Sequence, residues 1–213
     1  MKRPVEAFPN AYLEVDEPPN KALRNKALAF IAAGGIGFFA LVIFVLHFEP
    51  TGYNPLTQAV SDYAVGSFAW EMQLGFYIGG IGLATLGVLN YLSAKARSSK
   101  VGSALLFLAG IALFTVGAFP TDLEGTPATL HGIMHSVISQ VVFSAGPIGM
   151  VLISYAVGRR PFLATLVAWL TAGGFFALVT ALSLGASGLA ERLFIAVLVV
   201  WWFADSVYLS KSA

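Results

Sequence analysis

Long apolar runs recur along the chain and are separated by short polar segments. A helix needs about 20 mostly apolar residues to cross the hydrocarbon of a bilayer. Six runs come close to or exceed that length: Ala27–Phe48, Ala69–Leu92, Val101–Phe119, Pro127–Val157, Pro161–Leu184 and Leu189–Leu209. The pattern therefore predicts an all-α fold, a polytopic membrane bundle of six transmembrane helices.

The first 26 residues differ from the rest of the chain because they are polar and contain four prolines. They predict a polar N-terminal tail over residues 1–26, followed by a single six-helix transmembrane domain over residues 27–213. Within the spans, glycines are dense, as at Gly34, Gly35, Gly79 and Gly80. Small residues let helices approach closely in lipid, so we expect close helix contacts at these positions.

The composition agrees with a membrane protein and removes several kinds of chemistry. Hydrophobic residues make up 57% of the chain and charged residues 11%, whereas a soluble domain carries about 25% charge. The absence of cysteine excludes disulfides, thiolate metal sites and cysteine nucleophiles. The net charge of +1 gives no indication of nucleic-acid binding. The lipid bilayer is the partner that the sequence predicts.

The basic residues predict the orientation. With six spans, eleven of the twelve lysines and arginines fall on one side of the membrane, and only Arg192 falls on the other. The positive-inside rule then places both termini in the cytoplasm. We accordingly expect a multi-pass protein of the cytoplasmic (inner) membrane.

All three histidines fall at the predicted extracytoplasmic end of the bundle. His131 and His135 are four residues apart, so they share one helix face. Thr126 and Pro127 resemble a helix start, which would place His135 roughly 12 Å along the axis. The third histidine, His47, belongs to the same end, which also gathers other polar residues: Ser61, Asp62, Asp122, Glu191 and Arg192. The other end offers Asp205, which we expect near the interface, close to Lys211 or lipid headgroups.

Three stretches resemble a known family. They are SDYAVGSFAWEMQLGFYIGGIGL, GAFPTDLEGTPATLHGIMHS and GLAERLFI, and they resemble the bacterial and archaeal six-helix membrane family of unknown function numbered nine-nine-eight. This resemblance implies a fold and no defined activity. More distantly, a serine, an aspartate and three histidines in a helical membrane bundle resemble the superfamily of alkaline ceramidases and progestin/adipoQ receptors, which implies a zinc-dependent membrane amidase.

The residue types also suggest a metal site. Three imidazoles and a water form an open zinc site, in which zinc lowers the pKa of the water to about 7. His131 and His135 would supply two ligands and His47 the third. Asp122 would orient a ligand, ligate the metal itself or act as the base, and Ser61 would donate to a developing oxyanion.

Structural roles explain the same residues. The histidines can bond to carboxylates and loop carbonyls. Asp122 and Glu191 precede or open helices, where acids stabilise the N-terminus. Arg192 is expected to pair with Asp122, Asp62 or Glu191, or to hold an anionic headgroup.

Two function classes follow. One is a metal-dependent hydrolase that acts on a lipid or amphiphile, and it requires one open cavity joining His47, Asp122, His131 and His135. The other is a non-catalytic protein, either an accessory or structural subunit of a larger membrane complex or a small-molecule binder. In this second class the polar groups are expected to satisfy one another, with no cavity.

Overall fold

The computed structural model describes residues 19–123, 125–156 and 185–212, and all regular structure in these ranges is helical. Its elements are α1 (Pro19–Leu46), the short 3₁₀ helix η1 (Val60–Ala64), α2 (Ala69–Ser93), α3 (Arg97–Val116), α4 (Leu130–Ala156) and α6 (Ser187–Lys211). Five of these helices are long and apolar enough to cross a membrane. The all-α prediction is confirmed for this part of the chain, and the predicted span Pro161–Leu184 lies outside it.

The ends of two helices differ from the predicted spans. α1 begins at Pro19 rather than at Ala27, so residues assigned to the polar tail are helical. Proline is tolerated in the first turn of a helix, because the backbone N–H groups of that turn have no acceptor within the helix. The lysines and arginine that follow are good helix formers. α4 begins at Leu130, three residues after the predicted start at Pro127.

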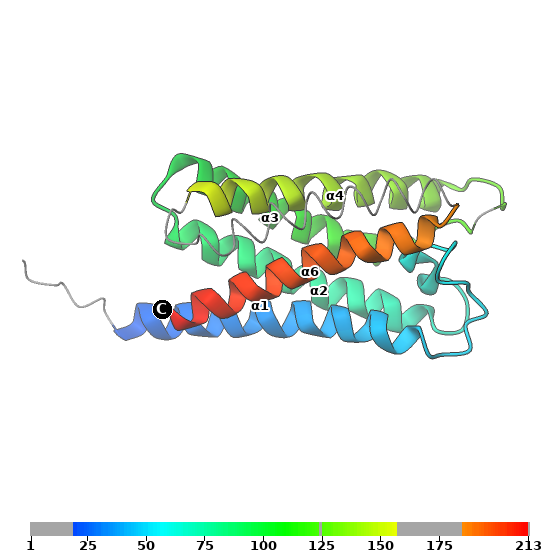
Figure 1. Ribbon diagram of the computed structural model, residues 1–213, viewed down its shortest axis with the longest axis horizontal. Helices are drawn as coiled ribbons and strands as arrows, with labels where there is room; N and C mark the ends of the chain where they lie inside the picture. Colours follow the sequence, from blue (N-terminus) through cyan, green and yellow to red (C-terminus); the bar gives the residue numbers. More distant parts are fainter. Residues whose placement is uncertain (1–18, 124, 157–184, 213) are drawn as a thin grey trace, which may run out of the picture.

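Neighbouring helices in the sequence are mostly neighbours in space (Figure 1). α2 packs against α1 and α3, α3 packs against α4, and α6 returns alongside α1. The start of α1, the α2–α3 turn and the end of α6 lie at one end of the bundle. The opposite end holds His47, His131 and His135 and is called the histidine end below.

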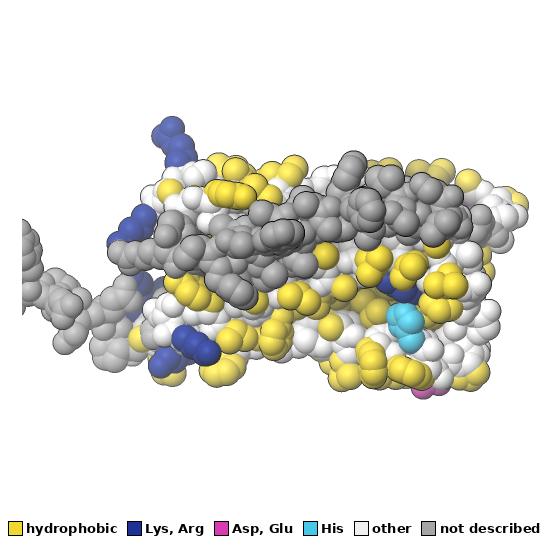
Figure 2. All heavy atoms as spheres, in the orientation of Figure 1, with side chains coloured by type: hydrophobic (Ala, Val, Ile, Leu, Met, Phe, Trp, Pro, Cys, Tyr) yellow, Lys and Arg dark blue, Asp and Glu magenta, His cyan; other side chains and the backbone are white. Residues whose placement is uncertain are grey.

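Charge follows the same division between the two ends. Basic side chains gather at the end away from the histidines, whereas the histidine end shows one basic side chain beside a histidine (Figure 2). This distribution is the one on which the orientation prediction rests. Which end faces the cytoplasm stays a prediction.

Glycines allow close helix approaches, as the sequence predicted for Gly35, Gly79 and Gly80, whereas the prediction was wrong for Gly34, where nothing lies within 4 Å of an added Cβ atom. A Cβ atom at Gly35 on α1 would lie 2.8 Å from the Cα atom of Gly82 on α2. A Cβ atom at Gly102 on α3 would lie 2.8 Å from the carbonyl oxygen of Gly149 on α4. Any larger residue would push these backbones apart, so the two helix pairs depend on glycine here.

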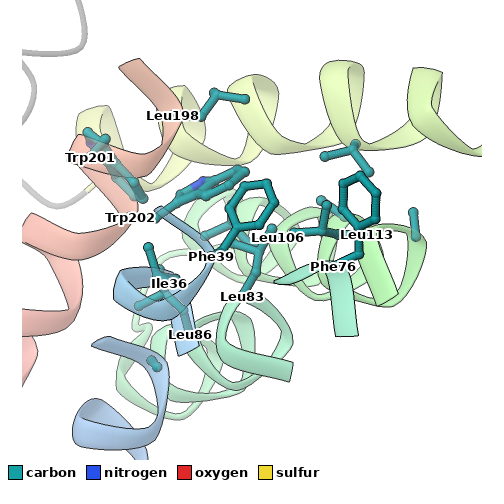
Figure 3. Close-up of a cluster of buried hydrophobic side chains, with 14 of the residues drawn as sticks. Ile36, Phe39, Phe76, Leu83, Leu86, Leu106, Leu113, Leu198, Trp201 and Trp202 are labelled. Atoms are coloured by element: carbon teal, nitrogen blue, oxygen red, sulfur yellow. The ribbon is translucent and has the colours of Figure 1, made fainter. Parts of the chain in front are cut away.

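Large apolar side chains from α1, α2, α3 and α6 fill the space between the helices (Figure 3). Phe39 and Phe76 pack with ring centroids 6.0 Å apart, and Figure 3 shows Trp202 reaching toward Phe39 from α6. Trp201 is completely buried and donates from Nε1 to the hydroxyl of Ser154 at 3.2 Å. The core thus ties α6 to both α1 and α4.

A buried polar pair lies in this core, where the sequence predicted an interfacial residue. Asp205 is 0% exposed, and its Oδ2 accepts a 2.7 Å hydrogen bond from Nδ2 of Asn90 on α2. Asp205 is therefore buried between helices and not open to lipid headgroups, whereas its predicted depth near the membrane interface stays a prediction. A buried carboxylate in a bundle needs polar partners, and Asn90 is one of them.

Candidate functional site

The connection between α1 and α2 is not helical throughout, and it brings distant segments together at the histidine end. α1 ends at Leu46, and the following connection contains Pro50, Pro55 and two glycines with positive φ, Gly52 and Gly66. These residues prevent a continuous helix. The connection folds back through η1 and contacts the start of α6, which positions the polar side chains described next.

His47 is held by α1 on one side and by α6 on the other. Its Nδ1 lies 2.6 Å from the carbonyl oxygen of Ile43, so Nδ1 carries the proton, because a carbonyl oxygen only accepts. Its Nε2 accepts a 2.8 Å hydrogen bond from Nε of Arg192. Both ring nitrogens are therefore occupied by protein groups.

Arg192 fastens the start of α6 to the connection between α1 and α2. Its Nη1 donates to the carbonyl oxygens of Gln58 at 2.5 Å and Gly188 at 3.0 Å. Its Nη2 donates to the hydroxyl of Tyr63 at 3.3 Å, and the guanidinium lies 5.5 Å from the centroid of that ring. In the described part of the chain its hydrogen bonds reach neutral groups, and not the carboxylates that the sequence suggested.

Two acids of this region, Glu191 and Asp62, accept hydrogen bonds from backbone N–H groups. Glu191 accepts from the backbone N–H of Val60 at 2.9 Å through Oε2. Asp62 is buried and accepts from the N–H of Ala59 at 3.2 Å. Both carboxylates thus satisfy donors of the η1 segment, and Glu191 joins that segment to α6.

Asp122 stabilises the start of α4. Its Oδ2 accepts from the backbone N–H of Thr129 at 2.7 Å, and its Oδ1 accepts from the Thr129 hydroxyl at 2.7 Å. The Thr129 hydroxyl in turn accepts from the N–H of Gly132 at 3.1 Å, so Thr129, and not Thr126, caps the helix. The two Thr129 bonds hold the pKa of Asp122 below its usual value.

The same contact explains the glycine between the two helix-four histidines. A Cβ atom at Gly132 would collide with the carboxylate of Asp122. A side chain at this position is therefore excluded while Asp122 caps α4. The glutamate that a His-Glu-x-x-His zinc helix carries here has no room.

His131 and His135 differ in their surroundings although they share one face. His131 is exposed, and its ring packs against Phe119 with centroids 5.9 Å apart. His135 is only 4% exposed, and its Nδ1 lies 2.7 Å from the carbonyl oxygen of Phe119. That bond places the proton of a neutral His135 on Nδ1, which leaves the lone pair on Nε2.

His135 lines a cavity of about 210 Å³ inside the histidine end. The polar part of its wall comes from η1, the α3–α4 connection, α4 and α6, and it includes Ser61, Thr121, His135, Ser139, Gln140 and Glu191. The apolar part comes from the core and includes Phe39, Phe76, Leu113, Val142, Leu198 and Trp202. Glu191 and Trp202 are eleven residues apart on α6, so the cavity extends roughly 16 Å along that helix.

One wall residue has an unmet hydrogen-bonding need. Trp202 is 2% exposed, and its indole Nε1 has no hydrogen-bond partner in the part of the chain that the structure describes. A buried donor without an acceptor costs roughly 1–3 kcal/mol. A residue of the cavity wall therefore carries a donor that an acceptor atom would satisfy.

The predicted three-histidine zinc site is not supported. Over residues 19–123, 125–156 and 185–212, no three His, Asp or Glu side chains are grouped so that they could hold a metal ion. A zinc ion at Nε2 of His47 would have to displace the Arg192 guanidinium, whose charge repels it. The residues present do not fit the metal.

Sequence reasoning found some cavity residues and missed others. Ser61, His135 and Glu191 were singled out and line one cavity, whereas His47 and Arg192 form a separate pair and Asp122 caps α4. Gln140 and Trp202 also line the cavity, although the sequence did not single them out. One helix residue resembles another until its neighbours are known.

One family matches the chain, and it is described as "Protein of unknown function (DUF998)". The match covers residues 31–208, so the chain belongs to this family. Together with the five membrane-length helices, the match identifies an integral membrane protein. No curated protein and no solved structure matches the chain, and the resemblance to the alkaline ceramidases has no support among these findings.

Proposed function

We propose that this membrane protein binds an amphiphilic small molecule in the cavity at its histidine end. The observation that carries the proposal is the make-up of the wall, which is polar toward η1 and the start of α6 and apolar toward the core. An elongated ligand with one polar end matches such a wall, because each part of it meets groups of its own kind.

The unpartnered indole of Trp202 narrows the class of ligand. Trp202 belongs to the apolar part of the wall, and its N–H has no acceptor in the described part of the chain, so the ligand should carry an acceptor, such as a carbonyl or ether oxygen, in its apolar part. At the polar end the carboxylate of Glu191 disfavours an anionic group. An uncharged hydroxylated head can bond to Ser61 and Gln140 there.

The wall also discriminates between the two predicted function classes. The hydrolase required His47, Asp122, His131 and His135 to join one cavity, and of these His135 contributes to its wall. The other three are engaged in the contacts described above. The whole non-catalytic class was expected to satisfy its polar groups without a cavity, and the cavity at the histidine end departs from that expectation. Within that class, the cavity favours a small-molecule binder over a structural subunit, because only the binder needs one.

The test compares two probes on purified protein in detergent. One is a medium-chain alcohol with a keto group near its far end, and the other is the same alcohol without the keto group. Saturable ligand binding raises the melting temperature and stabilises the protein by about 2.7 kcal/mol at 100 times Kd. We expect both probes to do so, with the keto probe tighter by about 0.5–1.5 kcal/mol, the value of one hydrogen bond.

Three variants assign the effect to the cavity. Trp202→Phe should remove the difference between the probes, because the N–H is lost. Val142→Trp should abolish both shifts, because Val142 is 4% exposed and lines the cavity. Val137→Trp is the matched control, since it lies on the same helix with 59% exposure. Equal shifts in Val142→Trp and the wild-type protein would refute the proposal.

A further inference from the structure

A second hollow lies on the outside of the bundle, between α1 and α6. This groove has a volume of about 450 Å³. Most of its lining consists of apolar side chains of the two helices, among them Ile43, Phe44, Val199 and Val200. Its polar lining residues are His47 and Arg192, both at the histidine end. From Arg192 to Val200 it spans eight residues of α6, or about 12 Å.

Arg192 gives this groove a cationic end. All of its hydrogen bonds within the described ranges go to neutral acceptors: the His47 ring, two carbonyl oxygens and the Tyr63 hydroxyl. The neighbouring carboxylate of Glu191 is directed to the N–H of Val60 instead. A guanidinium has five donors, and these bonds use four of them. One N–H of Nη2 is left for an anion, on a guanidinium whose charge also acts on the nearby carboxylate of Glu191.

The surroundings of the groove fit a lipid. Hydrophobic side chains border the histidine and the basic side chain at this end of the bundle (Figure 2). In a membrane, a long apolar groove on the outer surface of two spanning helices faces acyl chains. A cation at the end of such a groove lies where lipid headgroups begin.

We propose that the groove binds one anionic phospholipid, with an acyl chain along α1 and α6 and the phosphate against Arg192. Arginine suits this role because its planar fork binds phosphate oxygens with charge-assisted hydrogen bonds. His47 holds the guanidinium through Nε, and this bond fixes the orientation of the plane that carries the remaining Nη2 donor. The proposal is independent of ligand binding in the inner cavity. Val60 and Ile195 line both the cavity and the groove, so their side chains lie between the two.

The experiment counts lipids retained by the full chain in native mass spectrometry after extraction from vesicles of phosphatidylglycerol and phosphatidylcholine in equal amounts. The wild-type protein should retain one phosphatidylglycerol molecule with roughly fivefold preference, the effect of one basic residue at a membrane surface. Arg192→Gln should lose this preference. Equal retention of the two lipids by the wild-type protein would overturn the proposal.

A second variant tests the groove without touching Arg192, whose loss affects the fold as well. Val200→Trp fills the far end of the groove and should reduce phosphatidylglycerol retention, while Val101→Trp should not. The two valines are matched, with exposures of 51% and 50%, and Val101 lies on α3 outside the groove. Unchanged retention in Val200→Trp would refute the assignment to this groove. Displacement of phosphatidylglycerol by equimolar oleate would show a fatty-acid site and refute the phospholipid.

Discussion

The imidazole of His47 accepts a 2.8 Å hydrogen bond from Arg192, and this contact joins residues 145 positions apart, at the end of α1 and the start of α6. Its donor also holds the carbonyl of Gln58. Three segments therefore meet at one guanidinium. The sequence suggested His47 as a metal ligand, whereas in the structure its Nε2 accepts a hydrogen bond from the Arg192 guanidinium.

A double-mutant cycle should detect this contact. We expect His47→Phe and Arg192→Lys to be coupled by about 0.5–3 kcal/mol, as residues that share a hydrogen bond are. Thermal melts in one detergent measure the three variants and the wild-type protein. His131→Phe combined with Arg192→Lys serves as the control pair and should be additive, because His131 packs against Phe119 instead. Additivity in the His47 cycle would show that the contact contributes nothing.

Gly132→Ala should destabilise the protein although alanine is the better helix former. The added Cβ would collide with the Asp122 carboxylate, so the cap of α4 must move. Gly34→Ala is the matched control, because nothing lies within 4 Å of a Cβ atom there. Alanine at Gly34 should stabilise by up to about 0.8–1.0 kcal/mol, the difference in helix propensity. Melting temperatures that rise in both variants would contradict the contact between Gly132 and Asp122.

The Asp122 cap should make stability depend on pH in one direction. The pKa of Asp122 is lowered in the folded protein by its bonds to Thr129, so the folded state favours the charged carboxylate. Its contribution is complete above the unfolded pKa of about 3.9 and is lost as the pH falls through the lower folded value. Asp122→Asn should therefore be less stable than wild type at pH 7, and the difference should vanish at low pH. A difference that is constant with pH would exclude this cap.

The spans were predictable from the sequence because the bilayer imposes their length. The predicted Ala69–Leu92 and Leu189–Leu209 agree with α2 (Ala69–Ser93) and α6 (Ser187–Lys211) to within two residues at each end. The close approach of α1 and α2 at Gly35 was equally local, since small residues in a span have few other uses. These features depend on one helix, or on a pair that is adjacent in the chain.

The site was less predictable because its contacts depend on how the helices are arranged laterally. That His47 meets Arg192, and that Asp122 meets Gly132, follows from the loop paths and not from any residue pattern. Asp205 is the sharpest case. Its position near the end of an apolar run suggested the interface, and only the facing Asn90 of α2 shows why a carboxylate is tolerated in the core.

Asn90→Leu should lower the stability of the protein, because the buried carboxylate of Asp205 loses a hydrogen-bond donor. The substitution removes the Nδ2 donor at 2.7 Å from Asp205, which is completely buried. Leaving a buried acceptor with one partner fewer costs roughly 1–3 kcal/mol. Thr85→Val on the same helix is the control, because its hydroxyl bonds to its own helix, at the carbonyl of Ile81. Equal melting temperatures for Asn90→Leu and the control would show that Asp205 does not depend on Asn90.

Cysteine labelling should place the histidine end outside the cytoplasm, because the lysines and arginines gather at the opposite end. The chain has no cysteine, so single cysteines report their own position. Ala128→Cys lies in the exposed α3–α4 connection of the histidine end, and Lys95→Cys lies in the exposed α2–α3 turn at the other end. An impermeant thiol reagent added to intact cells should label the first variant, and it should label the second only after the membrane is opened. The reverse pattern would invert the orientation, and the anionic lipid proposed for the groove would then belong to the cytoplasmic leaflet.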